Sequence, residues 1–281
     1  MSTRTRRAST AAETLAITQS GRYVAPSGEN VNIHDAIQLA VHQTELITPG
    51  QQRALASRAV TQNSQRAFQT TIEVTRESTL AGARRLVTRF GPDRVAALNF
   101  ASAKNPGGGF LNGSQAQEES LARATALYPC LLSQSAYYDA NRRAPSALYT
   151  DHLIFSPQVP VFRDDNDDLL EEPWQVSFLT SPAPNAGALA NNHPHELDDL
   201  LPTFRRRIGQ LLAVALMRDQ TSLVLGAWGC GVFRNDPAAV ANLFAEFLLA
   251  DGPFTTVFEH ITFAILDRQG QTFAAFADVF H

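Results

Sequence analysis

Lysine is almost absent from this chain of 281 residues: Lys104 is the only one, and the net charge is −4. Proteins that bind nucleic acids in general carry a strongly basic surface, so this composition argues against direct nucleic-acid binding. We therefore expect any bound anion to be held mainly by backbone N–H groups and helix dipoles, not by lysine or arginine side chains.

Cysteine is also scarce, and long apolar runs are missing. Cys130 and Cys230 are the only cysteines and lie far apart. The basic segment at the N-terminus lacks the apolar stretch of a secretory signal, so we expect reduced thiols and no disulfide. No run approaches the roughly eighteen apolar residues of a membrane-spanning helix. These absences favour a cytoplasmic protein without a membrane partner.

The sequence does contain an alternation of apolar strands and amphipathic helices, with 44% hydrophobic residues. Two helical pieces are expected within residues 10–50. Strands are predicted at 71–75, 94–100, 152–155, 159–162, 175–179, 222–228 and 257–266, and helices at 79–90, 114–132, 198–217, 237–250 and 272–280. Residues 137–147 are expected to form a polar connection, and residues 164–172 an acidic hairpin tip. This order favours an α/β fold with a mixed sheet between helices on both faces.

The most informative stretch, Asn99 to Glu119, reads NFASAKNPGGGFLNGSQAQEE. Three glycines, 107–109, follow a predicted strand and precede a predicted helix, where free N–H groups and the helix dipole favour an anion. Glu118 and Glu119 come just after them. A phosphate-binding turn beside two adjacent carboxylates indicates a phosphorylated substrate and acid–base chemistry.

A second strand–glycine–helix junction lies later in the sequence. The apolar strand 222–228 continues into GCGVFRNDP, residues 229–237. Asp236 and Pro237 are typical of the cap and first residue of a helix. This second loop is again suited to binding an anion.

Metal-binding patterns are weak. His193, His195 and Glu196 form an H-P-H-E group that resembles a metal site, but no further ligand follows at a matching spacing. The acidic segment 164–172 lacks the glycine and the distal glutamate of an EF-hand loop. We therefore expect no metal.

Taken together, these motifs resemble one family. GGG followed after seven residues by QEE is similar to the signature of bacterial-type poly(ADP-ribose) glycohydrolases, and SPQVPVFRDD, SFLTSPAPNAG and GAWGCGVFRNDP are further matches. The two glycine loops also resemble those of macrodomains, the ADP-ribose-binding fold to which that family belongs. The resemblance implies a macrodomain-like three-layer α/β/α fold with a mixed central sheet at 70–281. An N-terminal helical extension at 11–69 packs with it as one unit, after a flexible tail at 1–10.

The resemblance also implies roles for individual residues. Glu119 is the general acid and base that hydrolyses the ribose–ribose O-glycosidic bond and releases ADP-ribose, mainly from chain ends. Glu118 holds hydroxyls of the distal ribose, and Gln117 helps to place the pair. The other implied substrate-binding residues are Asn99, Asn105, Gly107, Gly108, Gly109, Phe110, Gly229, Cys230, Gly231, Val232, Phe233 and Asn235. The loop 267–272 is the candidate for contacting adenine.

No cofactor is implied. The expected partners are poly(ADP-ribose), ADP-ribose and ADP-ribosylated proteins, and the expected state is a monomer that acts in DNA-damage signalling. Two alternatives stay open from sequence alone. A non-catalytic macrodomain that reads ADP-ribose would explain both glycine loops but would leave Glu118 and Glu119 without a role. A hydrolase of mono-ADP-ribosylated side chains or of O-acetyl-ADP-ribose would differ in the bond that is cut.

Overall fold

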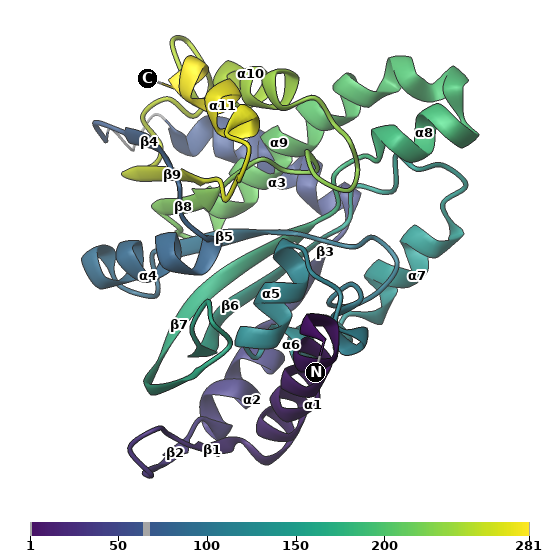
Figure 1. Ribbon diagram of the computed structural model, residues 1–281. Coiled ribbons are helices and arrows are strands. Elements are labelled where there is room, and N and C mark those ends of the chain that lie inside the picture. Colours follow the sequence, from purple (N-terminus) through teal and green to yellow (C-terminus); the bar gives the residue numbers. More distant parts are fainter. Residues whose placement is uncertain (1, 64–67, 281) are drawn as a thin grey trace.

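The computed structural model of the protein describes residues 2–63 and 68–280. Its centre is a seven-stranded mixed sheet in the order β3-β6-β7-β5-β8-β9-β4 (Figure 1). The strands are β3 (Glu45–Ile47), β4 (Thr71–Thr75), β5 (Val95–Phe100), β6 (Leu153–Arg163), β7 (Leu169–Ser181), β8 (Ser222–Leu225) and β9 (His260–Ala264). The strands from β7 to β4 run parallel, whereas β6 and β3 are antiparallel to their neighbours. Strands β1 (Arg22–Val24) and β2 (Asn30–Asn32) form a separate ribbon.

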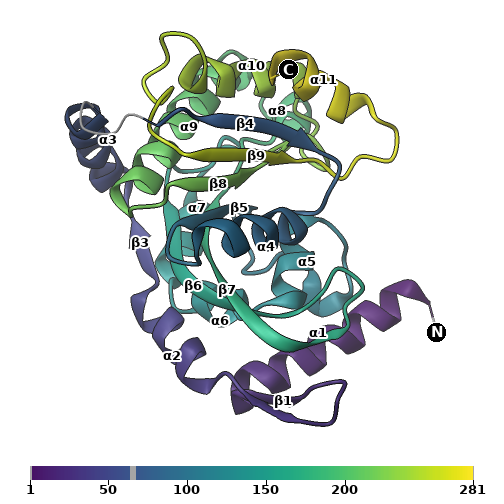
Figure 2. The same cartoon turned by 90° about the vertical axis from the view of Figure 1, so that its left-hand side faces the viewer.

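Helices cover both faces of the sheet, as Figure 2 shows for α4 in front of the parallel strands. They are α1 (Thr3–Ser20), α2 (His34–Gln43), α3 (Pro49–Asn63), α4 (Thr79–Phe90), α5 (Gln117–Ala124), α6 (Leu127–Leu132), α7 (Ser135–Arg143), α8 (Ala186–Asn192), α9 (Leu200–Met217), α10 (Pro237–Leu248) and α11 (Gln271–Phe280), with short 3₁₀ turns η1 (Phe110–Asn112) and η2 (Pro194–Asp199). The predicted three-layer α/β/α architecture is confirmed. No helix in the described part of the chain combines the length and hydrophobicity needed to cross a bilayer.

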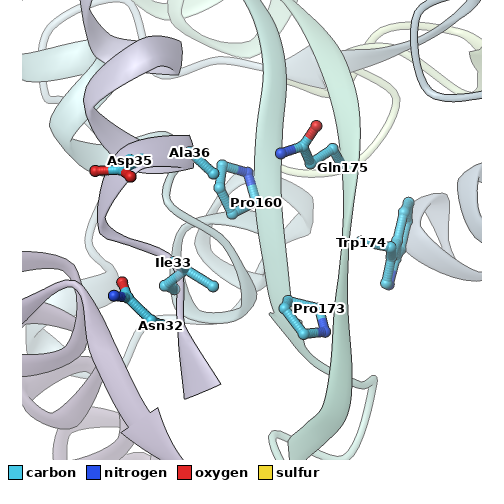
Figure 3. Close-up of a pocket in the computed structure, with 8 residues that line it drawn as sticks. All are labelled: Asn32, Ile33, Asp35, Ala36, Pro160, Pro173, Trp174 and Gln175. Carbon is cyan, nitrogen blue, oxygen red and sulfur yellow. The ribbon is translucent and has the colours of Figure 1, made fainter.

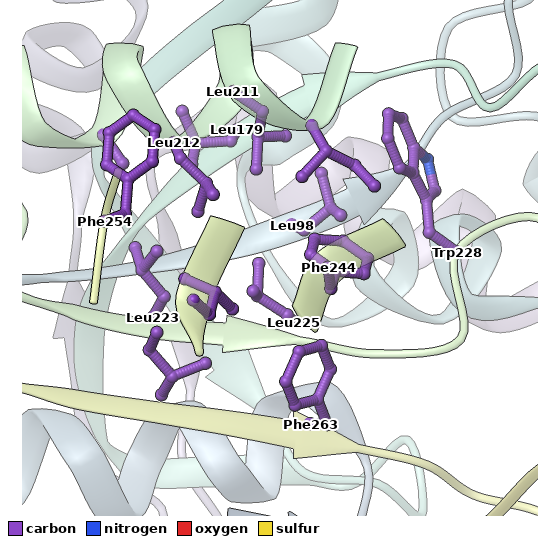
Figure 4. Close-up of a cluster of buried hydrophobic side chains, with 14 of the residues drawn as sticks. Leu98, Leu179, Leu211, Leu212, Leu223, Leu225, Trp228, Phe244, Phe254 and Phe263 are labelled. Carbon is purple, nitrogen blue, oxygen red and sulfur yellow. The ribbon is translucent and has the colours of Figure 1, made fainter. Parts of the chain in front are cut away.

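The strand period of two divides the core between the two faces. On β5, Ala96 and Leu98 pack with α9, α10 and α11, whereas Val95 and Ala97 pack with α2, α4 and α6. Figure 4 shows the first of these clusters, in which Leu98, Leu223 and other side chains meet α9 and α10. Fully burying one such leucine stabilises the fold by about 1.5–3 kcal/mol. The strands that carry the two glycine loops are therefore among the most firmly held.

Side-chain caps mark the starts of two of the predicted helices. Ser78 Oγ accepts a hydrogen bond from Ala81 N (3.0 Å) at the start of α4, and Asp236 Oδ1 accepts one from Ala239 N (2.7 Å) at the start of α10. Pro237 is the first residue of that helix, as expected.

The N-terminal region differs from the prediction. Met1 and residues 64–67 lie outside the described residues. Residues 3–10, expected in a flexible tail, form the first half of α1, which Ser2 caps through Thr5 N (3.2 Å). The extension 11–69 is also not wholly helical, because β3 joins the central sheet beside β6. Long-range contacts of α1 with the rest of the protein, described below, explain its order.

Three predictions near the middle of the chain are also corrected. The expected helix 114–132 is broken into α5 and α6, because Thr125 forms a bridge with Val161 and Ala126 N donates to Pro160 O (2.9 Å). The expected polar connection 137–147 contains α7. The two short strands at 152–155 and 159–162 form one strand, β6, whose irregular register after Ser156 accommodates its prolines.

Candidate active site

The two glycine loops meet at one edge of the sheet. Strands β5 and β8 are parallel neighbours, and β7 flanks β5 on its other side, so their carboxyl ends open into the same region. An open cleft of about 1890 Å³ lies there. Residues from both glycine loops, from the start of α5 and from the end of β9 line it.

The first glycine loop is shaped to meet Glu119. Gly107 and Gly108 have positive φ angles of 66° and 60°, which side-chain-bearing residues rarely adopt. A Cβ atom on Gly108 would collide with the Glu119 carboxylate. Gly109 N donates a hydrogen bond to Glu119 Oε1 (3.0 Å). The glycines therefore let the loop backbone approach the Glu119 carboxylate closely, and the hydrogen bond from Gly109 N orients it.

Glu118, unlike Glu119, is buried, with only 3% of its surface exposed. Its Oε2 accepts a hydrogen bond from Ser102 N (2.6 Å), and its Oε1 accepts one from Asn99 Nδ2 (3.3 Å). Asn99 Nδ2 also donates to Thr180 Oγ1 on β7 (3.2 Å). Burial and, to a smaller extent, the charge of Glu119 raise the pKa of Glu118 to about 8, against the hydrogen bonds that favour the ionised form. Near neutral pH, Glu118 is therefore largely protonated in the unliganded protein.

Gln117 joins the start of α5 to the end of β5. Its Oε1 accepts a hydrogen bond from Phe100 N (2.9 Å), and its Nε2 donates to Leu98 O (2.7 Å) and to Thr79 Oγ1 (3.1 Å). With every hydrogen-bonding group of its amide engaged, Gln117 is placed to position the two acids. Each of the three consecutive side chains 117–119 thus accepts a hydrogen bond from a backbone N–H group.

The second glycine loop is fixed by Asn235. Its Nδ2 donates to Pro184 O and Gly229 O, both at 2.9 Å. Gly229 has a φ of 74°, and a Cβ there would lie 2.6 Å from that of Ala183. In the described part of the chain, the backbone N–H groups of residues 231–233 have no hydrogen-bond partner. Consecutive free N–H groups at the wall of a cleft form an anion site.

The predicted site residues occupy two kinds of position. Those that line the cleft are Asn105, Gly108, Gly109, Gln117, Glu118, Glu119, Gly229, Cys230, Gly231, Val232 and Phe233. Asn99, Gly107, Phe110 and Asn235 lie outside this lining and support it. The Phe110 ring is fully buried and packs edge-on against Tyr128, with ring centroids 4.8 Å apart. Burial also raises the pKa of the Cys230 thiol to about 12, so this thiol is not poised as a nucleophile.

Residues outside the two glycine loops and α5 also line the cleft. Tyr149 lines it from just beyond the segment 137–147, which was expected to be a polar connection, and its ring centroid lies 6.1 Å from that of Phe233. Asp267, Arg268 and Thr272, from the loop expected to contact adenine, also line the cleft.

Helix α1 reaches the first glycine loop from outside. Arg4 Nε donates to Asn112 O (3.0 Å), and Arg7 Nε donates to Gly113 O (2.8 Å). Gly113 has a φ of 71°, and a Cβ there would collide with the backbone of Arg4. The helix thus closes over the end of the loop that holds Glu119.

Two other features lie away from this cleft. A smaller hollow of about 440 Å³, shown in Figure 3, lies between the segment around α2 and the β6–β7 hairpin, with Asp35 and Trp174 in its lining. Its lining lacks a glycine loop and contains one carboxylate. Among the described residues, only His193, His195 and Glu196 have the mutual spacing of metal ligands, and none of them lines the large cleft.

The buried Glu118 carboxyl predicts a specific dependence of stability on pH. The folded protein keeps this proton up to a pKa of about 8, whereas the unfolded chain loses it near about pH 4.3. Between these values the folded state binds one more proton, so this group lowers stability by up to about 1.4 kcal/mol for each pH unit of increase. Glu118→Gln should therefore lose less stability than the wild type between about pH 5 and about pH 8.

Urea unfolding of both proteins at several pH values measures this difference. Glu29→Gln, which alters an exposed glutamate on the β1–β2 ribbon, is the matched control and should follow the wild-type profile. Parallel profiles for the wild type and Glu118→Gln would show that Glu118 is ionised in the fold throughout this range.

Comparisons with known proteins agree with this geometry. The family model described as "Microbial-type PARG, catalytic domain", where PARG denotes poly(ADP-ribose) glycohydrolase, matches residues 11–164. The crystal structure of poly(ADP-ribose) glycohydrolase from Thermomonospora curvata is 47% identical, with a TM-score of 0.90 over 98% of this chain and 99% of that chain. The same enzyme bound to the inhibitor ADP-HPD is 48% identical, with a TM-score of 0.89 over 97% and 98% of the two chains.

A third similar structure is poly(ADP-ribose) glycohydrolase from Deinococcus radiodurans in complex with ADP-ribose. It is 52% identical, with a TM-score of 0.82, and the match covers 87% of this chain and 97% of that chain. A search of curated protein sequences finds no match. With about half of all residues identical over nearly the whole fold, and with the glycine loops and acid pair assembled at one cleft, this chain belongs to the microbial-type poly(ADP-ribose) glycohydrolases.

Proposed function

We propose that this poly(ADP-ribose) glycohydrolase uses Glu119 as its general acid and base and releases ADP-ribose mainly from the ends of the polymer. The observation that carries the proposal is the position of Glu119. Its carboxylate lies at the cleft wall, held by Gly109 N, and the second glycine loop lines the same cleft. In the first step Glu119 gives its proton to the leaving 2′ oxygen as the distal ribose becomes cationic. It then takes a proton from the attacking water.

The different environments of the two acids support this division of roles. Most glycosidases use two separated carboxyl groups, but here Glu118 is buried and fixed by Ser102 and Asn99. Burial, with a smaller contribution from the charge of Glu119, raises the pKa of Glu118 to about 8, so this carboxyl group can act as a hydrogen-bond donor near neutral pH. Glu118 is then suited to hydrogen-bonding the distal ribose hydroxyls, while the more accessible Glu119 transfers the protons.

The second glycine loop supplies the diphosphate site in this proposal. The free N–H groups of residues 231–233 offer donors to phosphate oxygens without a lysine. Gly229 and Asn235 keep the loop in the required shape. Val232 is 81% exposed, so its side chain is available to cover a bound diphosphate. We also propose the loop 267–272 for adenine, and a cytoplasmic monomer that acts on ADP-ribosylated proteins, as expected from the sequence.

The position of α1 supports the proposed preference for chain ends. Arg6 and Arg7 line the cleft beside the glycine loop, so a polymer that continues in both directions from the bond to be cut must pass this helix. A terminal unit needs no such passage.

A time course of poly(ADP-ribose) digestion, with products resolved by chromatography, tests this preference. Cleavage from the ends should yield free ADP-ribose from the first time points, while the remaining chains shorten gradually. Early accumulation of intermediate oligomers would instead show that internal bonds are cut first.

A further inference from the structure

Outside the cleft, three potential metal ligands converge where η2 follows α8. His193, His195 and Glu196 each offer one ligand atom, and these atoms all lie within 4.8 Å of one another. Glu196 Oε1 lies 3.9 Å from His193 Nδ1 and 3.8 Å from His195 Nε2. One carboxylate oxygen therefore faces both imidazole rings.

The local backbone explains this convergence. In a 3₁₀ helix, side chains three residues apart lie on the same side, so Glu196 and His193 lie next to each other. Pro194, the first residue of η2, restricts the backbone between the two histidines. The sequence offers no ligand beyond the H-P-H-E group. In the structure, Glu196 provides the third ligand beside the two histidines.

The carboxylate is also oriented by a neighbour. Ser146 Oγ donates a hydrogen bond to Glu196 Oε2. The same hydroxyl accepts a hydrogen bond from Leu148 N (3.0 Å), which directs its proton toward Glu196. Oε2 is thus engaged and Oε1 is left facing the imidazoles. Hydrogen bonds of this kind orient the ligands in metal sites.

We propose that His193, His195 and Glu196 bind one late first-row divalent cation, best represented by Zn²⁺. Two imidazoles and one carboxylate are a frequent protein ligand set for Zn²⁺, with a fourth position for water. Bonds of about 2.1 Å to a tetrahedral centre place ligand atoms about 3.4 Å apart, so small side-chain rotations suffice. The His195 side chain is 76% exposed and free to make them. Mg²⁺ and Ca²⁺ prefer all-oxygen sites.

The bound cation stabilises the fold and takes no part in the reaction. Ser146, which contacts Glu196, begins the turn that leads to Tyr149 at the cleft, and Tyr149 N donates to Ser146 O (3.3 Å). Asn185 N, just before α8, donates to Ala147 O (3.0 Å). A cation at Glu196 would therefore add a further connection between η2 and this turn. Because it binds the folded state, it should raise the unfolding temperature.

Zinc binding to chelator-treated protein tests the proposal, with Zn²⁺ alone as the probe, a competing chromogenic chelator as the readout and thermal unfolding as a second readout. The wild type should bind one Zn²⁺ per chain. Glu196→Gln keeps a partner for Ser146 but removes the charge, and it should weaken binding by more than about tenfold, as should His195→Ala. Ser146→Ala, which removes only the supporting hydrogen bond, should weaken it by about tenfold.

Two control variants exclude other sites. His42→Ala removes an exposed histidine on α2, and Cys130→Ser removes a buried thiol remote from η2, so neither should change the affinity. Zn²⁺ should raise the unfolding temperature of these controls but not that of Glu196→Gln. The proposal is overturned if the wild type binds no stoichiometric Zn²⁺, or if Glu196→Gln and His195→Ala bind it as tightly as the wild type.

Discussion

Glu119→Gln should lower the rate of ADP-ribose release by about 10²- to 10⁴-fold, the contribution typical of a general acid or base. The glutamine amide has nearly the shape of the carboxyl group and can still accept the hydrogen bond from Gly109 N. It cannot give a proton to the leaving oxygen or take one from water. Affinity for ADP-ribose should therefore stay near that of the wild type. Chromatographic product analysis measures the rate of release, and calorimetry measures the affinity for ADP-ribose.

A matched substitution makes this result specific. Glu77 also lines the cleft, but it forms an ion pair with Arg85 (2.7 Å) and lies away from the glycine loop contacts. Glu77→Gln should retain most of the activity. Equal loss of binding and turnover in Glu119→Gln would assign Glu119 to substrate binding instead. Binding without release by the wild type would remove the catalytic role altogether.

Gly108→Ala should lower turnover by about 100-fold, because a misplacement of about 1 Å at a reacting group costs that much. The new Cβ would collide with the Glu119 carboxylate and displace it from Gly109 N. The φ of 60° at this position adds a backbone strain of about 1–2 kcal/mol for alanine. Single-turnover rates measure the effect on catalysis, and urea unfolding of the same variant measures the loss of stability from backbone strain.

Gly28→Ala serves as the control for strain alone. Gly28 has a φ of 92°, and no atom lies within 4 Å of a Cβ placed there. This variant should lose stability and keep full activity, since Gly28 lies in the β1–β2 turn. If Gly108→Ala turned over substrate at the wild-type rate, the contact between the glycine loop and Glu119 would have no part in catalysis.

The parts of the fold that were predictable from sequence depend on local signals. The apolar residues of β5, Ser78 at the start of α4 and Asp236 at the start of α10 each act through neighbours in sequence. The break after α5 does not, because it depends on the bridge between Thr125 and Val161 across the fold. Helix α1 was missed for the same reason, since its contacts reach residues 112 and 113.

The candidate site also contains parts that local sequence predicts and parts that depend on contacts across the fold. The glycine run and Glu119 lie within one motif, so their proximity could be inferred. The contact of Asn99 with Thr180, 81 residues apart, needed the pairing of β5 with β7. Tyr149 reaches the cleft through a turn whose sequence carries no signal. The family resemblance implied Phe110 as a substrate-binding residue, but its ring packs in the core beside α1.

One feature of the acid pair bears on how freely this sequence can change over evolutionary time. Gln117, Glu118 and Glu119 are each oriented by a main-chain N–H group, from Phe100, Ser102 and Gly109. Every residue except proline carries that group, so substitutions at the donor positions 100 and 102 preserve the hydrogen bonds as long as the backbone path is kept. The sequence at these donor positions can therefore vary while the geometry of the acid pair is kept.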